Sequence, residues 1–552
     1  MELLQQAAQR SPERPAVVVG GVAGADGEAR RVSFGELRRR AASVAGGLER
    51  RGLAPGDRVV VFVPMSLDLY AALVGVLQLG AVAVFVDPWV GRRRIAAFTA
   101  LAAPAAFVGT PRSHLLRLLD RRLRSIPLAV TTGRRFGPLP APVSLRELLD
   151  EPPAGAIAER SPSDPALVTF TTGSSGLPKG ANRTHGFLAA QHRALAEEFP
   201  LRPDDVELTT FPVFSLHNLA SGVPTVVPPV DLRRVSDFDP VLVLELMERE
   251  GVTTCTASPP FVDRLIEGLE RGARRPRLRR LLTGGAPVED AQLRAWRRAL
   301  PETDIVVAYG STEAEPVAHV TAAERLAATS NVRPRSPGYC LGRPSSQVRV
   351  KILRLAGGAI TLGPAGWAEQ EVEPGAIGEL VVAGEHVCKS YYRSPEAERA
   401  NKIVDIVDGR GAGTEVWHRM GDTVYRDGEG RLWLVGRVHS TIRRGGVDLH
   451  PQLVEQAARG EDPRIRRAAA AGVPDPALGE RLVVVLEATA RADSRLPVEA
   501  GERLRAAGFT VDDLLLTARP LPLDPRHRSK IDYPRLRADL ERGRFGALRS
   551  RR

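Results

Sequence analysis

A run of glycine and hydroxyl-bearing residues, TTGSSGLPKG, occupies positions 171–180 and contains a lysine near its end. Glycines let backbone N–H groups turn toward an anion, hydroxyls add donors, and a lysine adds a positive point charge. We therefore interpret the run as a candidate phosphate-binding loop. Its candidate ligand-binding residues are Thr171, Thr172, Gly173, Ser174, Ser175, Gly176 and Lys179.

The spacing of this loop excludes the common P-loop, which requires G-x-x-x-x-G-K-[ST]. Five residues after Gly173 the chain has Pro178, and Gly180 follows the lysine instead of preceding it. The same composition is typical of a surface turn, because Gly, Ser and Pro all favour turns. The loop by itself therefore fits two interpretations about equally well, a phosphate-binding loop and an ordinary surface loop.

The stretch FTTGSSGLPKG (170–180) resembles the phosphate loop of the adenylate-forming superfamily, which includes acyl-CoA synthetases, firefly luciferases and nonribosomal peptide adenylation domains. Thr172 stands where that superfamily more often has serine, and it keeps the hydroxyl. Other stretches resemble the remaining superfamily motifs in the same order, so the resemblance covers nearly the whole chain. These are LLTGGAP (281–287), AYGSTEAEP (308–316), HRMGD (418–422), GR (436–437) and RHRSKID (526–532).

The resemblance implies a role for each motif. Tyr309 would stack on adenine, Thr312 would contact the α-phosphate region, and Glu313 would hold Mg²⁺. Asp422 would bind the ribose hydroxyls, and Lys530 would be the adenylation lysine. The other nucleotide-binding residues that it implies are Gly285, Ala286, Pro287, Gly310, Ser311 and Arg437.

Each of these residues taken singly has a plainer interpretation. Glu313 could be a solvated surface acid, Asp422 a turn former, and Lys530 one more cation in a basic tail. Lysine is scarce, however, with 5 Lys against 72 Arg, and two of the five occur in GLPKG and RSKID. Chance matches in the right order across residues 170–531 are therefore remote.

Joining a carboxylate to AMP by in-line attack on the α-phosphate brings two anions together and expels pyrophosphate. Cationic groups, Mg²⁺ and tight positioning must then offset the developing negative charge. We expect Lys530, Thr172 and Glu313 to be catalytic, with ATP and Mg²⁺ as cofactors. A non-catalytic nucleotide sensor remains a remote alternative, because Glu313, Asp422 and Lys530 are all present.

The stretch FPVFSLHNLASG (211–222) falls where the superfamily places a gate between nucleotide and acyl group. His217 is our fourth candidate catalytic residue, with a core or surface histidine an equal alternative. No aspartate is positioned to bind an α-amino group, and the neighbours are apolar, so we expect a fatty or β-hydroxy fatty acid as substrate.

Two second half-reactions are compatible with the sequence, acyl transfer to CoA and β-lactone formation. Spacing in 436–455 resembles acyl-CoA synthetases, where Gly445 and Gly446 would let pantetheine pass, so acyl transfer to CoA is the first expectation. The alternative is β-lactone formation, because PLDPRHRSKID, HRMGD and the loop resemble the β-lactone synthetases of bacterial olefin biosynthesis. In the superfamily the small domain rotates about a hinge between half-reactions. His439 replaces the expected hinge residue, and we expect it to be an exposed loop histidine, with an altered hinge or a base as the alternative.

Around these motifs the sequence predicts an α/β fold. Apolar strand-like runs at 57–64, 81–88 and 104–111 alternate with helical runs, which is typical of parallel strands with crossover helices. The apolar stretch 67–86 is nearly long enough to cross a bilayer, but Asp68, Gln78 and Gly80 favour a helix, a glycine stop and a buried strand. Further strands are predicted at 166–170, 251–259, 279–285 and 303–310.

Beyond residue 338, short alternating runs separated by glycines predict an antiparallel, β-barrel-like subdomain. We therefore expect an N-terminal adenylate-forming domain of doubly wound sheets and this subdomain at 1–435. A small, mobile α+β lid domain carrying Lys530 is expected at 436–545, with a hinge at Gly436 and Arg437.

The 552 residues carry a net charge of +12, but 5% aromatics and no zinc-finger or ribonucleoprotein motif argue against nucleic-acid binding. Three cysteines without C-x-x-C spacing indicate a reducing compartment, and no signal peptide is recognisable, so we expect a cytoplasmic protein without a transmembrane segment. The expected partner is a small carboxylic acid; CoA, a carrier protein and neighbouring pathway enzymes are further candidates.

Overall fold

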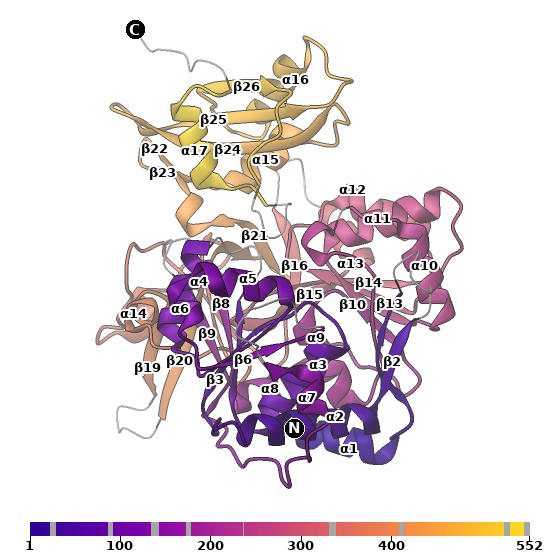
Figure 1. Cartoon of the computed structure of the whole chain (residues 1–552). Coiled ribbons are helices and arrows are strands. Elements are labelled where there is room, and N and C mark those ends of the chain that lie inside the picture. The colour runs from indigo at the N-terminus through magenta and orange to yellow at the C-terminus, as the bar shows by residue number, and fades with distance from the viewer. Residues whose placement is uncertain are drawn as a thin grey trace.

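The computed structural model describes residues 1–21, 29–86, 92–133, 143–172, 178–235, 237–330, 338–407, 413–523 and 530–545. Its elements form a large N-terminal body and a small C-terminal part that stands above it beyond β21 (Leu432–Arg437) (Figure 1). Three sheets organise the described residues. The arrangement confirms the predicted α/β class with a large and a small part.

The first third of the chain forms a seven-stranded sheet, parallel except for its last pair, β8 and β9. The expected strands at 57–64, 81–88 and 104–111 are present as β3, β4 and β5. This confirms the alternation read from the sequence. In spatial order the strands are β7 (Val143–Ser144), β6 (Leu128–Thr131), β5 (Ala106–Gly109), β3 (Arg58–Phe62), β4 (Val82–Val86), β8 (Pro165–Thr172) and β9 (Pro178–Thr184).

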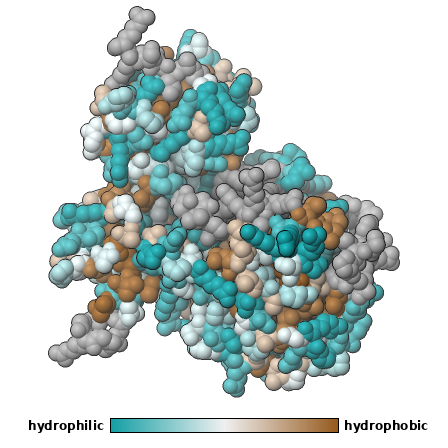
Figure 2. Space-filling model, turned by 60° about the vertical axis from the view of Figure 1, so that its left-hand side comes forward, coloured by the Kyte–Doolittle hydropathy of each residue, from teal (hydrophilic) through white to brown (hydrophobic). Residues whose placement is uncertain are grey.

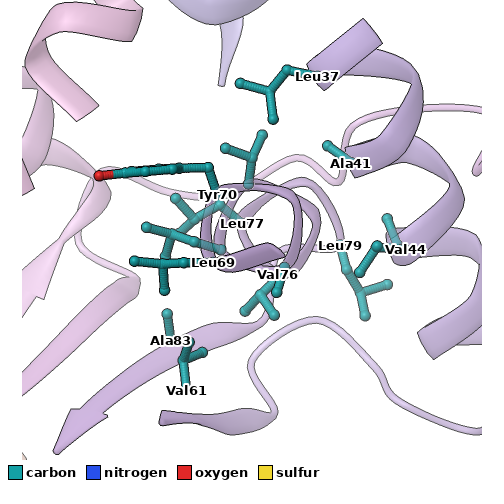
Figure 3. Packing of buried hydrophobic residues seen from close by; sticks show 14 of the residues in the cluster. Leu37, Ala41, Val44, Val61, Leu69, Tyr70, Val76, Leu77, Leu79 and Ala83 are labelled. Carbon is teal, nitrogen blue, oxygen red and sulfur yellow. The ribbon is translucent and has the colours of Figure 1, made fainter. Parts of the chain in front are cut away.

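The apolar stretch 67–86 forms helix α3 (Leu67–Gln78) followed by strand β4. Ser66 caps the helix by accepting a hydrogen bond from the Leu69 amide, and Gly80 follows with φ +74°, which favours glycine. Figure 3 shows the apolar side chains of α3 lying between helix α2 (Phe34–Glu49) and the strands beneath. The stretch is apolar because it lies at the centre of a hydrophobic core and is packed on several sides.

Tyr70 of α3 extends from this core, and its hydroxyl lies 2.7 Å from the hydroxyl of Ser215 on helix α9 (Pro212–Ser221). The tyrosine is fully buried, and burial raises its pKa well above the ordinary value. The bond ties α9 to the core of the first sheet. That helix carries His217, so the core fixes the position of one predicted site residue.

The second sheet has fourteen strands, parallel in its centre and antiparallel beyond β14. The expected antiparallel region after residue 338 is thus continuous with the parallel strands through β15 and β16. Its strands run in the order β17 (Arg349–Leu353), β18 (Gly378–Ala383), β20 (Gly413–Arg426), β21, β16 (Tyr339–Pro344), β15 (Ala314–Thr321), β14 (Asp304–Ser311), β13 (Arg280–Gly284), β12 (Thr254–Ala257), β10 (Glu207–Thr209), β11 (Thr225–Val227), β1 (Pro15–Val19) and β2 (Arg30–Ser33), with β19 (Lys402–Val407) on β20.

A five-stranded sheet forms the C-terminal part. Its central pair is long, and each strand has a buried run of six residues in its middle, as the apolar runs in that region require. The strands are β23 (Val447–Leu449), β22 (Ile442–Arg444), β25 (Gly479–Ala488) and β24 (Ile465–Asp475), with β26 (Asp513–Thr517) beside β25. The helices packed on it are α15 (Pro451–Arg459), α16 (Leu496–Ala506) and α17 (Tyr533–Glu541).

Helices of the N-terminal body pack around the two larger sheets (Figure 1). The remaining ones are α1 (Glu2–Arg10), α4 (Arg92–Ala102), α5 (Pro111–Leu119), α6 (Arg121–Arg124), α7 (Leu145–Leu149), α8 (His185–Glu198), α10 (Pro240–Arg249), α11 (Pro259–Glu270), α12 (Asp290–Ala299), α13 (Ala322–Ser330) and α14 (Pro395–Asn401). Hydrophilic residues predominate on the face in Figure 2, with hydrophobic ones in separate patches. Across the described ranges, no helix combines the length and apolarity needed to cross a bilayer.

Candidate active site

Three residues from separate motifs meet near the ends of β14 and β21 and beside the neighbouring part of β20. The Tyr309 hydroxyl donates to Asp422 Oδ2 at 2.5 Å, and Arg437 Nε lies 2.7 Å from Asp422 Oδ1. The backbone produces this meeting, because Asp422 and Arg437 are directly opposed in the β20–β21 pair. The structure therefore brings together the residues predicted to contact adenine and ribose.

Burial and the Asp422 carboxylate set the charges of this group. Burial and the Asp422 carboxylate raise the pKa of Tyr309, so the phenol stays protonated. The Asp422 carboxylate raises the pKa of Arg437, which stays charged. Asp422 is 4% exposed, and its Oδ1 accepts no well-aligned hydrogen bond from the described residues despite its closeness to Arg437. A buried carboxylate oxygen with a vacant lone pair suits a ligand hydroxyl.

Glu313, the predicted metal ligand, is 9% exposed and lies in the turn between β14 and β15. Its Oε1 accepts a hydrogen bond from the Tyr391 hydroxyl at 3.0 Å. Its backbone amide donates to the Ser311 hydroxyl at 3.2 Å, and its carbonyl accepts from the Cys388 amide at 2.7 Å. The residue is thus held at both its backbone and its side chain, which a solvated surface acid is not.

Two lysines lie near this carboxylate. Lys179 Nζ donates to Asn401 Oδ1 at 3.1 Å; burial lowers its pKa, and the charge of Glu313 opposes that effect. Lys402 donates to the Cys388 carbonyl, and its Nζ lies 5.0 Å from the centre of the Tyr391 ring. Burial also lowers the pKa of Lys402. The site thus combines one carboxylate with two cations, as a phosphate-binding region requires.

Backbone positions on either side of Glu313 are also fixed. Arg183 donates twice to the Thr312 carbonyl, at 3.0 and 2.7 Å. A Cβ at Gly310 would lie 2.7 Å from the Ala314 carbonyl oxygen, so only glycine fits there. Gly285 has φ +79° in the turn after β13, which explains glycine in the GGAP motif. Ala286 and Pro287 continue this turn toward α12.

His217 belongs to a different region, a pocket between helices α8 and α9 and the strands β10, β12 and β13. Its Nδ1 lies 3.0 Å from Nδ1 of His192 on α8. Burial lowers the pKa of His217 to about 3, so it is neutral at physiological pH. His217 contacts neither Glu313 nor Asp422. It lines the pocket together with apolar side chains such as Phe214 and Leu282.

Lys530 lies at the edge of the described residues, next to Ile531, whose backbone bridges to Leu523. Tyr533 begins α17 three residues later and donates to Glu455 Oε1 at 2.9 Å. Tyr533 also contributes to the raised pKa of Arg437, so the start of α17 is near the Asp422 group. His439, after the Gly436–Arg437 pair, is exposed, as we expected.

Part of the predicted phosphate loop cannot be compared with the structure. Gly173, Ser174, Ser175 and Gly176 lie outside the described residues. Thr171 and Thr172 end β8, whose backbone pairs with Lys179 and Pro178 of β9. The described ends of the motif are therefore hydrogen-bonded to one another in the β8–β9 pair.

Several residues that the sequence did not reveal contribute to the site. Tyr391 and Lys402 surround Glu313, Arg183 holds the Thr312 carbonyl, and His192 pairs with His217. Lys402 alone gave a signal, since it is one of five lysines in the chain. The others are recognisable only once their distant partners are in place.

The residues present fit ATP and Mg²⁺. Asp422 Oδ1 is a buried acceptor without a well-aligned donor, which suits a ribose hydroxyl. Glu313 supplies a hard carboxylate oxygen, and Mg²⁺ typically takes one or two carboxylates together with substrate phosphates. Among the described residues, no group of three or more His, Cys, Asp or Glu side chains could hold a metal ion by itself. A metal here would be shared with the nucleotide.

Similarity to known proteins agrees with this geometry. The chain is 32% identical over 512 residues to an olefin β-lactone synthetase from Stenotrophomonas maltophilia, covering 92% of this chain and 90% of that protein. It is also 32% identical over 520 residues to a feruloyl-CoA synthase from Amycolatopsis sp, covering 91% and 92%. The amide bond synthetase McbA from Marinactinospora thermotolerans has a similar fold, with TM-score 0.76 at 24% identity and coverage of 97% and 99%. Because the model of the family described as AMP-binding enzyme matches residues 4–392, the chain belongs to the AMP-binding enzymes, as an adenylate-forming acyl ligase.

Proposed function

We propose that this protein uses ATP and Mg²⁺ to convert a β-hydroxy fatty acid to its acyl-adenylate, and then closes the acyl group onto its own hydroxyl as a β-lactone. The observation that carries the first step is the Tyr309–Asp422–Arg437 group, which holds a buried carboxylate with remaining acceptor capacity. Similarity to the olefin β-lactone synthetases of Stenotrophomonas maltophilia and Xanthomonas campestris, over 92% and 97% of this chain, supports the second step.

In the first step the substrate carboxylate oxygen attacks the α-phosphorus, and pyrophosphate leaves. Lys179 and Lys402 would offset the negative charge of the phosphates, and Glu313 would hold Mg²⁺, which would supply further positive charge there. Tyr391 would keep the Glu313 carboxylate oriented through its 3.0 Å hydrogen bond. Lys530, brought in by the C-terminal lid domain, would contact the reacting carboxylate and α-phosphate.

In the second step the substrate hydroxyl oxygen attacks the acyl carbon. The bond to AMP breaks, and the hydroxyl proton must leave. His217 lines the pocket as a neutral imidazole and would take this proton, passing one from its Nδ1 to His192, which is half-buried and closer to solvent. AMP and the lactone are then the products, without any thiol.

Acyl transfer to CoA is the second candidate, favoured by similarity to the Amycolatopsis feruloyl-CoA synthase. The sequence argument for CoA rested on Gly445 and Gly446. Both glycines have positive φ, +58° and +81°, in the two-residue loop between Arg444 and Val447. Such a hairpin turn demands glycine by itself, so these residues no longer favour CoA.

Product analysis separates the two candidates. The protein is incubated with a β-hydroxy fatty acid, ATP and Mg²⁺, with CoA withheld, and the products are analysed by mass spectrometry. We expect AMP and a product lighter than the acid by one water. An acyl-adenylate that persists until CoA is added would support thioester formation instead, and no AMP with any acid would refute adenylation.

A further inference from the structure

Arg183 is a buried cation that links two parts of the nucleotide site. It lies on β9, four residues after Lys179, and is 3% exposed. Burying a guanidinium removes it from water, which is costly unless protein groups accept its hydrogen bonds. Its Nε and Nη2 both donate to the Thr312 carbonyl oxygen, at 3.0 and 2.7 Å, and its Cζ lies 5.5 Å from the centre of the Phe187 ring. Two donors of one planar guanidinium are thus directed at a single backbone atom.

The carbonyl that Arg183 holds belongs to the peptide group joining Thr312 to Glu313. The N–H of the same planar group, on Glu313, donates to the Ser311 hydroxyl at 3.2 Å, so both polar ends of this group are held. The carbonyl of Glu313 in turn accepts from the Cys388 amide at 2.7 Å. Because the peptide groups on both sides of the Glu313 Cα are held, the direction in which its side chain leaves the backbone is set.

Different groups hold the two ends of the Glu313 side chain. Tyr391 donates to its carboxylate at 3.0 Å, whereas Arg183 acts on the backbone from which the side chain extends. Losing the Tyr391 donor frees the carboxylate to turn about its last torsion. Losing the Arg183 donors frees the backbone of the turn, and a small backbone rotation displaces the carboxylate oxygens further than a turn of the carboxylate does. The contact from Arg183 is therefore the stronger control on where these oxygens lie.

Strand β9 connects this contact to the lysine expected at the phosphates. Lys179 and Arg183 are four residues apart on the strand, or roughly 13 Å in extended backbone. The strand is the last of its sheet, and the Tyr392 amide donates to its Gly180 carbonyl at 2.8 Å, so residues 390–392 lie along it. One strand thus carries the lysine, holds the turn before the carboxylate, and supports the segment that contains the tyrosine donor.

We propose that Arg183 is a positioning residue for adenylation, which fixes the direction in which Glu313 presents its carboxylate to Mg²⁺ and the ATP phosphates. This inference rests on the proposed function only in the assignment of Glu313 to Mg²⁺. Arg183 acts through the Thr312 carbonyl, so its loss should weaken Mg²⁺-dependent binding and the chemical step while leaving metal-free nucleotide binding nearly unchanged. A displacement of about 1 Å in a positioned group can lower a rate by about 10²-fold.

Two substitutions of Arg183 are compared with a matched control. Arg183→Lys keeps the charge but replaces the planar fork by a single ammonium group, and Arg183→Met removes every donor. The control is Arg325→Lys, because Arg325 is also buried, donates to the Val288 carbonyl, and has its Cζ 5.5 Å from the centre of the Tyr339 ring. Glu313→Gln tests the metal assignment itself. Thermal unfolding shows which variants are folded, and Arg183→Lys decides the question if Arg183→Met is not.

Binding and chemistry are measured separately. Isothermal titration calorimetry gives the affinity for α,β-methylene-ATP, an analogue that cannot release pyrophosphate, with and without Mg²⁺. The ratio of the two affinities isolates the contribution of the metal, which a general loosening of the fold would not change selectively. ATP–pyrophosphate exchange with a saturating β-hydroxy fatty acid gives kcat and the Mg²⁺ concentration for half-maximal rate.

We expect Arg183→Lys to bind the analogue about tenfold more weakly with Mg²⁺ and within about twofold of the wild type without it, and to lower kcat by about 10- to 100-fold. Arg183→Met should show the same pattern with larger effects. Arg325→Lys should change the two affinities by the same factor. Equal losses with and without Mg²⁺ in Arg183→Lys, or an unchanged affinity and kcat, would overturn the proposal.

The Glu313→Gln variant separates failure of this inference from failure of the proposed function. An unchanged Mg²⁺ dependence in Glu313→Gln would refute the metal assignment and the proposal with it. A changed dependence in Glu313→Gln beside an unaltered Arg183→Lys would refute the role of Arg183 alone. Exchange with no acid would refute adenylation, while the calorimetry would still decide the role of Arg183.

Discussion

Replacing Asp422 by asparagine is the sharpest test of the nucleotide site. The substitution keeps the size of the side chain and removes its charge, so the neutral amide oxygen accepts more weakly from Tyr309 and from a ribose hydroxyl. A hydrogen bond to a charged group contributes roughly 1.5–3 kcal/mol, against about 1 kcal/mol for a neutral one. The loss of about 1–2 kcal/mol for a ribose contact corresponds to ATP binding weakened by about 5- to 30-fold.

The effect on stability should be smaller than the effect on binding. The side chain of Arg437 is 40% exposed, so its ion pair with Asp422 contributes only about 0–1 kcal/mol to folding. ATP affinity is measured by isothermal titration calorimetry and stability by thermal unfolding of the same preparations. Tyr309→Phe, which keeps the ring and removes the donor to Asp422, should weaken ATP binding by about fivefold.

Asp427 provides a matched control in the same hairpin. It accepts from Trp433 Nε1 at 2.8 Å and from Arg431 Nε at 2.7 Å, so its partners are also an aromatic donor and an arginine. Asp427→Asn should reduce stability by a similar amount and leave ATP affinity unchanged. Unaltered affinity in Asp422→Asn, or an equal loss in Asp427→Asn, would refute the assignment of Asp422 to the ribose.

Three further predictions concern other parts of the molecule. Lys530→Ala should abolish acyl-adenylate formation in the pyrophosphate-exchange assay and leave ATP titration nearly unchanged; full exchange would reject its catalytic role. Tyr391→Phe removes the donor to Glu313 Oε1 and should raise the Mg²⁺ concentration for half-maximal exchange by roughly tenfold, with kcat recovered at saturating Mg²⁺. An unchanged Mg²⁺ dependence would contradict a positioning role. Burial raises the pKa of Glu455 to about 7 from 4.5, so the folded state holds a proton that the unfolded state releases, and stability falls as pH rises between those values. Denaturant unfolding should therefore find Glu455→Gln more stabilising at about pH 8 than at about pH 5, by up to about 3 kcal/mol, and an equal difference at both would contradict this.

The parts of the site that could be predicted from sequence are those defined within single motifs. Tyr309, Gly310 and Glu313 lie on one strand and its turn, so a short signature contains their geometry. The meeting of Tyr309 with Asp422 spans 113 residues, and only the resemblance to a known family predicted it. The secondary structure of the α3–β4 region could also be predicted from the local sequence, since a capped helix, a glycine stop and an apolar strand follow one another.

The residues that were missed act through burial and distant contacts, which composition does not encode. Tyr391 lies 78 residues from Glu313, and His192 lies 25 residues from His217 on another helix. Gly445 and Gly446 show the converse ambiguity, because a hairpin turn and passage of a ligand both favour glycine.

Contacts between the two parts of the chain bear on the second half-reaction. Arg459 of α15 lies 2.9 Å from Glu289 Oε1, and the Gly338 amide donates to Gln456 Oε1 at 3.0 Å. A rotation of the C-terminal part to admit a thiol would break such contacts, together with the proximity of Tyr533 to Arg437. Closing a β-lactone brings in no second substrate, because the attacking hydroxyl is already bound beside the acyl carbon. The arrangement with α17 near the nucleotide group can therefore serve both proposed steps, which is a physical reason for an altered hinge to be tolerated.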